Sequence, residues 1–268
     1  MASTPSGGGG FYHAFTLQMN VIGALVLREL HTRFGRNNVG YLWMIGEPLM
    51  FGTAIAAIHS FQAPHHQGSG MEPVAFGVLG YCIFIIFRGI FNKAESILET
   101  SLPLMYHRMI SVLNLSIARV VIEAAGCFCS LVILMGLCMA LGFAQPPVRP
   151  LWVIAAIFWL IWMSFALGLN VTWLTYDRPT LARLVHPISY FMMPLSGAFV
   201  ATEWLPYNMQ LIFDWNPMAS IFEYARYGWF ESGSDEHLFP AYISACCAIL
   251  SYTGLLGIRR LRNRIQLH

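Results

Sequence analysis

Three residues spaced four positions apart, Trp43, Glu47 and Phe51, combine a carboxylate with two aromatic rings. In a helix, this spacing puts all three side chains on one face. A carboxylate inside an apolar stretch is unfavourable unless it faces protein or water. The set therefore favours non-covalent contact with a polar solute on a water-filled path. The alternative is structural: Glu47 pairs with a basic residue of the first helical turn.

A second pair of aromatic residues, Tyr190 and Phe191, lies between Pro187 and Pro194. Proline inside a helix leaves backbone carbonyls without partners. Such interruptions persist in membranes where protein or a water-filled path covers them. We expect these rings to line the same path, and packing against lipid or neighbouring helices is the alternative.

A basic patch, formed by Arg28, Arg33 and Arg36, comes directly before the first long apolar run. Such a patch meets anionic headgroups at the inner membrane surface and helps to set the orientation of the chain. It is also suited to contact with the anionic head of a glycolipid. Both interpretations remain open.

The composition is that of a polytopic membrane protein. Hydrophobic residues make up 57% of the 268 residues and charged residues 10%, whereas soluble domains carry roughly a quarter charged residues. Mean hydropathy is +0.58. The sole lysine, Lys93, follows Asn92, so the chain has no G-x-x-x-x-G-K-[ST] phosphate loop. Any ATP that drives this protein must be bound by another subunit.

Metal, cofactor and nucleic-acid chemistry have little support in this sequence. The cysteines lie in apolar runs without zinc-type spacing and behave as small hydrophobic residues. His59, His65 and His66 lie close together, but a metal site needs further ligands. We expect no metal, no cofactor in this chain and no nucleic-acid partner. No grouping of acidic residues and histidine suggests catalysis.

The hydropathy pattern predicts an all-α fold with six transmembrane helices. Residues 1–10 are expected to be disordered, and residues 11–36 to form an interfacial amphipathic helix. Residues 40–258 form the transmembrane domain, and residues 259–268 a cytoplasmic tail. The expected spans are residues 40–60, 74–91, 112–143, 151–174, 181–200 and 239–258.

Basic residues in the connections predict the orientation. They gather on one side of the predicted spans, which the positive-inside rule assigns to the cytoplasm, so both termini are expected there. Arg149 and Arg226 fall on the other side. The residues on the cytoplasmic side are Arg28, Arg33, Arg36, Lys93, Arg108, Arg119, Arg178, Arg183, Arg259, Arg260, Arg262 and Arg264.

The connection at residues 92–111 is more regular than a simple loop. A short amphipathic helix there needs a partner for its apolar face. It either packs on the inner surface of the protein itself or docks into a groove of a cytoplasmic ATPase. The residues that recur at helical spacing are Glu95, Ile97, Leu98, Glu99 and Leu102.

The longest external segment, residues 201–238, is acidic and aromatic. Loops of this length are rarely without structure, and Trp and Tyr rings are favoured at membrane interfaces. We expect two short helices at or near the external surface. Glu223 and Arg226 are three residues apart on the second helix and can pair within the chain, with direct substrate contact as the alternative.

Three tracts resemble one family of transporters. The tract T-R-F-G-R-N-N-V-G-Y-L-W-M-I-G-E-P-L resembles the start of the first span in type-2 ATP-binding-cassette permeases that export polysaccharides. Gly40, Leu42, Trp43 and Pro48 occupy the family positions, and Val39 stands where leucine is common. N-P-M-A-S-I-F-E-Y-A-R-Y-G-W-F and P-I-S-Y-F-M-M-P-L-S-G resemble the tract before the last span and the fifth span. Capsule polysaccharide export permeases of Gram-negative inner membranes are the most similar group.

The resemblance implies an inner-membrane permease that works as a homodimer with two cytoplasmic ATPase subunits, which hold ATP and magnesium. It implies export of an acidic, lipid-linked capsule polysaccharide to a periplasmic adaptor and an outer-membrane export protein. Residues 92–111 then form the coupling segment and residues 201–238 the periplasmic helices. Glu47 and the aromatic residues described above are expected to line the conduit at the dimer centre.

Other functions remain as alternatives to capsule export. A related permease can export O-antigen, teichoic acid or a drug, because cavity shape determines the substrate. A membrane enzyme acting on lipid-linked sugars and a secondary transporter are more distant alternatives. Secondary transporters often contain inverted repeats, and this sequence shows no clear internal repeat.

Overall fold

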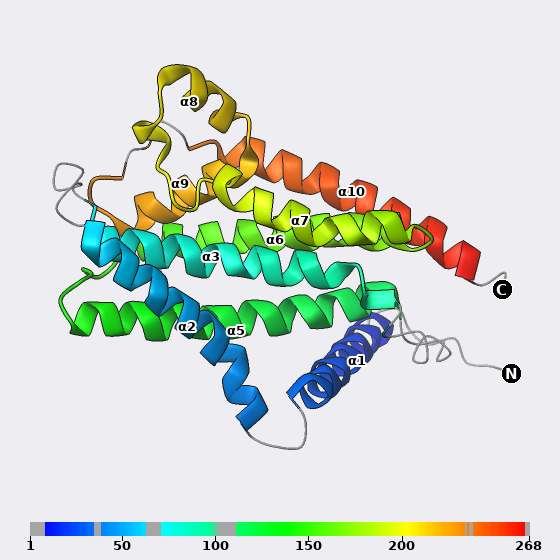
Figure 1. Cartoon of the computed structure of the whole chain (residues 1–268). Helices are drawn as coiled ribbons and strands as arrows, with labels where there is room; N and C mark the ends of the chain where they lie inside the picture. The colour runs from blue at the N-terminus through cyan, green and yellow to red at the C-terminus, as the bar shows by residue number, and fades with distance from the viewer. Residues whose placement is uncertain are drawn as a thin grey trace, which may run out of the picture.

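All regular elements of the computed structural model are helical within the residues that it describes (Figure 1). These are residues 9–34, 39–62, 71–98, 100, 111–233, 235 and 238–265. The elements are α1 (Gly9–Phe34), α2 (Val39–Gln62), α3 (Pro73–Ala94), α5 (Val112–Ala140), α6 (Pro150–Thr175), α7 (Pro179–Leu195), the 3-10 turn η2 (Thr202–Trp204), α8 (Tyr207–Asp214), α9 (Pro217–Trp229) and α10 (Pro240–Ile265).

Proline and capping residues define where several helices begin. α3, α6, α7 and α9 each start with proline, whose fixed φ suits the first turn and whose missing N–H has no intrahelical role there. The Ser111 side chain accepts a hydrogen bond from the Asn114 amide at the start of α5. Asn216 does the same for the Met218 amide at the start of α9.

Four of the six predicted spans, now α3, α5, α6 and α10, are long and apolar enough to cross a membrane within the described residues. α2 coincides with the first predicted span, and its described apolar part is Gly46–Ile58. α7 ends at Leu195 and not at residue 200. The chain turns there because Gly197 adopts a φ of +74°, which favours glycine. Six complete crossings therefore stay a prediction.

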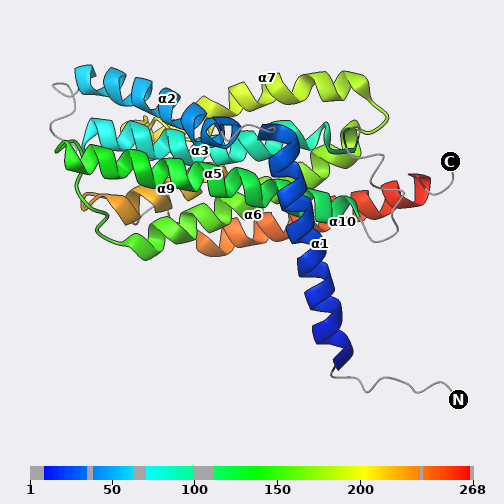
Figure 2. The ribbon, with the colours of Figure 1, turned by 90° about the horizontal axis from the view of Figure 1, so that it is seen from below.

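The central helix of the bundle is α3. Figure 2 shows α2 and α7 on one side of α3, and α6 and α10 on the other. A Cβ at Gly80 of α3 would overlap the carbonyl oxygen of Ala198, so glycine permits this close approach of helix and loop. The largest fully buried side chains of α3 are Leu79, Ile83, Phe84, Ile86 and Phe87.

Polar contacts join α6 to α10. The indole N–H of Trp159 donates to Ser244 at 3.2 Å, and that of Trp162 donates to Ser251 at 3.0 Å. The Asn170 amide also donates to a backbone carbonyl of α10 at 2.8 Å. α10 therefore supplies acceptors to polar groups of α6 in an otherwise apolar part of the bundle.

The first helix, α1, extends away from the bundle (Figure 2). Tyr12, in its first half, is exposed. Its second half packs on α5, where Leu25 joins Leu115 and Ala118 in a small apolar cluster. A helix is therefore present where the sequence predicts one at residues 11–36, and its location in the membrane interface stays a prediction.

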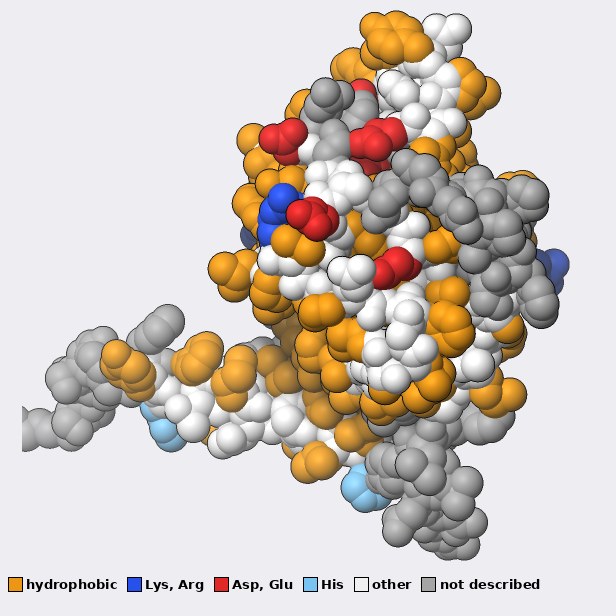
Figure 3. Space-filling model, turned by 90° about the vertical axis from the view of Figure 1, so that its left-hand side faces the viewer, with side chains coloured by type: hydrophobic (Ala, Val, Ile, Leu, Met, Phe, Trp, Pro, Cys, Tyr) orange, Lys and Arg blue, Asp and Glu red, His pale blue; other side chains and the backbone are white. Residues whose placement is uncertain are grey.

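Two short helices, α8 and α9, lie between α7 and α10. α9 packs against α6 and α3 and is largely buried, whereas no residue of α8 is buried. Figure 3 views the end of the bundle that carries both helices, where acidic side chains outnumber basic ones among the described residues. Glu203, Glu231 and Asp235 of this segment are exposed. The external position of this segment stays a prediction.

Candidate functional site

A cavity of about 590 Å³, lined by apolar and ionisable side chains, lies between α2, α3, α5 and α7. Five Glu, Lys, Arg or His side chains line it, although the surrounding helices are apolar. Ionisable groups at such depth are unfavourable unless they face protein or water, and they commonly mark transport paths. The five are Glu47, Arg88, Lys93, Glu123 and His186.

Two of the three basic side chains in the cavity have a carboxylate partner. Lys93 pairs with Glu123 across α3 and α5, at 2.5 Å between Nζ and Oε1. His186 on α7 lies 3.4 Å from Glu95, measured between Nε2 and Oε1. These contacts connect α7 and α5 to the C-terminal end of α3.

The third basic side chain, Arg88, contacts an aromatic ring instead. Its Cζ atom lies 4.2 Å above the centre of the Tyr190 ring. No carboxylate of the described residues lies within ion-pair distance of Arg88. The guanidinium therefore lines the cavity with its hydrogen-bond donors available to a ligand.

The structure brings together part of the predicted conduit set. Glu47 and Phe51 line the cavity, and Tyr190 joins them through Arg88. Phe191 is 69% exposed and does not line the cavity. Trp43 lies on α2, and its side chain is outside the described part of the structure. The acidic and basic residues of the cavity that the sequence analysis did not select as conduit residues are Arg88, Lys93, Glu123 and His186.

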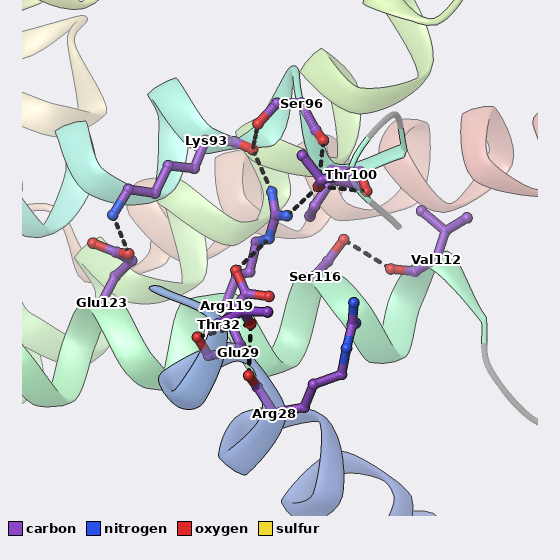
Figure 4. Close-up of polar contacts among 11 residues, drawn as sticks. Arg28, Glu29, Thr32, Lys93, Ser96, Thr100, Val112, Ser116, Arg119 and Glu123 are labelled. Carbon is purple, nitrogen blue, oxygen red and sulfur yellow. Dashed lines mark hydrogen bonds and ion pairs between the residues drawn. The ribbon is translucent and has the colours of Figure 1, made fainter. Parts of the chain in front are cut away.

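Arg119 forms a second polar centre near the C-terminal end of α3 (Figure 4). Its Nη1 donates to the backbone carbonyl of Lys93 at 3.0 Å, and its Nη2 donates to the Thr100 hydroxyl at 2.6 Å. Its Nε lies 3.2 Å from a carboxylate oxygen of Glu29. One buried side chain of α5 thus connects α1, the end of α3 and the segment that follows α3.

The predicted coupling residues fall into two groups. Ile97 and Leu98 are buried in a small cluster with Val112 and Leu261, so they contact helices of the same chain, and Glu95 contacts His186. The remaining two, Glu99 and Leu102, lie outside the described residues. Docking of this segment to an ATPase stays a prediction.

The basic patch is described only at Arg28. This half-buried residue lines a polar pocket of about 310 Å³ together with Thr32, Ser96 and Arg119. The Arg33 side chain and the whole of Arg36 lie outside the described part of the chain. Contact of this patch with a headgroup stays a prediction.

Glu223 and Arg226 form a buried ion pair on α9, at 2.7 Å between Oε1 and Nη1. The same Glu223 oxygen accepts hydrogen bonds from the Thr202 amide and hydroxyl, both at 2.8 Å. Arg226 also donates to the Gly197 carbonyl and lies 4.7 Å above the Phe76 ring. Burial lowers the pKa of the Arg226 guanidinium, and the nearby Glu223 carboxylate opposes that shift. The pair fastens α9 to the turn after α7 and to α3.

Metal ligands are not grouped in the part of the chain that the structure describes, where no three His, Cys, Asp or Glu residues could hold an ion. The side chains of His59, His65 and His66 lie outside that part. The cysteines are free, and Cys82, Cys127, Cys138 and Cys247 are buried.

Comparison with known proteins identifies the family. The family model for the ABC-2 type transporter matches residues 20–230. The chain is 30% identical over 258 residues to the capsule polysaccharide export inner-membrane protein CtrC of Neisseria meningitidis serogroup B, covering 96% of each chain. It is 31% identical over 256 residues to the capsule polysaccharide export inner-membrane protein BexB of Haemophilus influenzae, again covering 96% of each.

A more distant relative extends the range of similarity. The polysialic acid transport protein KpsM of Escherichia coli is 27% identical over 237 residues, which are 86% of this chain and 85% of KpsM. Residues 20–230, which the family model matches, include the cavity helices α2, α3, α5 and α7. Because the family model covers most of the chain and the relatives match almost end to end, this protein belongs to the ABC-2 type transporter family.

Proposed function

We propose that this chain is the transmembrane permease subunit of an ATP-driven exporter that moves lipid-linked, acidic capsular polysaccharide across the bacterial inner membrane. The observation that carries the proposal is near full-length similarity to two capsule polysaccharide export inner-membrane proteins. The cavity lined by ionisable side chains inside an apolar bundle supports it, because a hydrophilic polymer needs a hydrated path. The chain is a transport subunit rather than an enzyme.

Energy for export comes from two partner ATPase subunits, which hold ATP and magnesium. The lack of a phosphate loop around the sole lysine supports this division of labour. The coupling segment receives the ATPase movement through Glu95, Ile97, Leu98, Glu99 and Leu102. Arg119 supplies a physical connection from Thr100 of that segment to α1 and α3.

A second copy of the chain completes the conduit. The faces of α2 and α7 beside the cavity expose large apolar side chains, among them Met50, Phe51, Ile188 and Phe191. Such surfaces are suited to face lipid or another protein. In the homodimer, Trp43, Glu47, Phe51, Tyr190 and Phe191 face the path of the polymer.

The proposed topology has six crossings with both termini in the cytoplasm, which the distribution of basic residues supports. α1 lies along the inner membrane surface, where Arg28, Arg33 and Arg36 contact lipid or glycolipid headgroups. The acidic outer end with α8 and α9 faces the periplasm, where the adaptor and the outer-membrane export protein receive the polymer.

The test is deletion of the gene from its host, followed by location and analysis of the polymer. We expect full-length polysaccharide to accumulate in the cytoplasm, and complementation to restore it to the surface. Absence of all polymer would favour an enzyme of polymer synthesis instead. Unchanged surface polymer would overturn the proposal and favour a different substrate. Chemical analysis of the trapped polymer distinguishes capsule from O-antigen or teichoic acid.

A further inference from the structure

Arg88 is a charged residue in the most buried of the four long apolar helices. It lies on α3, whose neighbouring side chains Phe84, Phe87 and Ile90 are buried. An unneutralised guanidinium among such residues is unfavourable unless it contacts water or an anion. The cavity between α2, α3, α5 and α7 supplies the water-accessible side.

The other two basic side chains of the cavity each face a carboxylate. Lys93 is held by Glu123, and His186 faces Glu95. Arg88 differs because, among the described residues, it has no carboxylate partner and its guanidinium lies 4.2 Å above the centre of the Tyr190 ring. A ring stabilises a cation through its π face but leaves the planar N–H donors free for a carboxylate or a phosphate.

Two neighbouring groups complete a site for a sugar unit. Tyr190 is 57% exposed, so one part of its ring remains open for contact while another part meets Arg88. Asn92 lies one helical turn from Arg88 and lines the same cavity. Its Oδ1 atom is buried without a hydrogen-bond donor among the described residues, and a sugar hydroxyl is a suitable donor.

Glu47 sets a limit on how tightly an anion can be held. It lines the same cavity from α2 and forms no recorded ion pair with Arg88. A carboxylate within the same cavity lowers the local preference for anions. Such a site suits transient contact, which conduction requires.

We propose that Arg88, with Tyr190 and Asn92, binds one acidic sugar unit of the polymer during its passage. The Arg88 guanidinium contacts the carboxylate or phosphate of that unit, the Tyr190 ring contacts its apolar face, and the Asn92 oxygen accepts from a hydroxyl. This inference rests on the proposed export function. It specifies the chemistry that the cavity recognises: an anionic saccharide.

The first test measures surface polymer in a deletion strain complemented with variants of matched protein level. Arg88→Gln is expected to lower surface polymer about tenfold, and Arg88→Lys to have an intermediate effect because lysine keeps the charge without the planar donors. Arg183→Gln, which removes an exposed arginine of α7, serves as the control and should export normally. Wild-type export by Arg88→Gln would overturn the inference.

This design separates the two proposals. If deletion traps no polymer, the export function itself fails. If deletion traps polymer and Arg88→Gln exports normally, only the inference about Arg88 fails.

The second test measures binding by the purified permease–ATPase complex in lipid nanodiscs. The probes are short fragments of the host polymer, either native or with their acidic groups neutralised by reduction or esterification. We expect native fragments to bind the wild type about tenfold more tightly than Arg88→Gln, and neutralised fragments to bind both proteins equally. Equal binding of native fragments to both proteins would overturn the inference.

Nanodiscs with and without phosphatidylglycerol distinguish polymer from lipid as the source of the anion. The expected difference between wild type and Arg88→Gln persists in neutral lipid. If the difference appears only with phosphatidylglycerol, Arg88 contacts a lipid phosphate and the assignment to the polymer is wrong.

Discussion

Two regions of the bundle place a guanidinium over an aromatic ring, with different surroundings. At the outer end, Arg226 lies 4.7 Å above Phe76 and also pairs with Glu223. In the cavity, Arg88 lies 4.2 Å above Tyr190 without a carboxylate partner in the described residues. Both arginines contact a ring, so the ring does not distinguish them. The carboxylate does: it makes Arg226 part of a structural ion pair, whereas Arg88 keeps its N–H donors for a ligand.

The Glu223–Arg226 ion pair is closed to solvent. The Arg226 side chain is 4% exposed, and Glu223 satisfies the amide and the hydroxyl of Thr202 as well as the guanidinium. Burial of such a pair makes the loss of either partner costly, because the remaining charge has no counterion. Arg88 and Glu47 have no ion-pair partner among the described residues, so their substitution should affect transport more than folding.

The largest predicted effect on stability is at the Glu223–Arg226 ion pair. Arg226→Ala leaves Glu223 buried without its cation and should lower the free energy of unfolding by about 3–5 kcal/mol. Denaturant unfolding of the purified protein in detergent measures this change. Arg183→Ala, at an exposed position, is the control. Equal stability of the Arg226 and Arg183 variants would contradict the idea of a structural anchor.

The turn to which Arg226 is attached gives a second test. Gly80→Ala introduces a Cβ that overlaps the Ala198 carbonyl oxygen, and overpacking of this kind costs about 1–3 kcal/mol. Gly136→Ala is the matched control, because nothing lies within 4 Å of a Cβ there and alanine is the better helix former by about 1 kcal/mol. The midpoint temperature of thermal unfolding should fall for Gly80→Ala and rise for Gly136→Ala. A rise of the midpoint temperature for both variants would show that α3 and the turn at Ala198 leave room for a Cβ at Gly80.

Substitution of Arg119 is expected to have an intermediate effect on the free energy of unfolding and to affect transport as well. Arg119→Lys keeps the charge but cannot reach Glu29, Lys93 and Thr100 together, so roughly 1–2 kcal/mol of stability should be lost with two hydrogen bonds. Export per ATP hydrolysed should also fall in membrane vesicles that contain the complex. A variant with reduced stability but an unchanged ratio of export to hydrolysis would limit Arg119 to folding.

The smallest effect on stability is predicted in the cavity. Glu47→Gln should change the free energy of unfolding by no more than about 0.5 kcal/mol, as for exposed sites without buried partners, because Glu47 is exposed on α2. Surface polymer should nevertheless fall several-fold. Unchanged export together with unchanged stability would remove Glu47 from the mechanism.

Sequence alone predicted where the long helices lie, because apolar runs of sufficient length have few alternatives in a membrane protein. The four helices α3, α5, α6 and α10 follow that pattern. The end of α7 was placed too late, because hydropathy continues past Leu195 while the backbone turns at Gly197. Hydropathy does not report a positive φ.

The candidate site was predictable only in part. Glu47 and Phe51 were predicted from their spacing on one helix, and both line the cavity. Arg88 lies inside the second predicted span, but the sequence analysis gave it no role in the site, although a charge inside a span is itself a signal of function. The pairing of Lys93 with Glu123 joins two helices, and no local pattern specifies which faces of two helices meet.

The contacts between α6 and α10 have a consequence for the way the chain is made. α10 is the last of these helices to leave the ribosome, and until it arrives two indole N–H groups of α6 lack their serine acceptors. Unsatisfied donors in hydrocarbon cost several kcal/mol each. A nascent chain that stops short of Ser244 therefore differs from a finished one within the bilayer itself. Membrane proteases and insertion factors have a physical basis for telling the two apart.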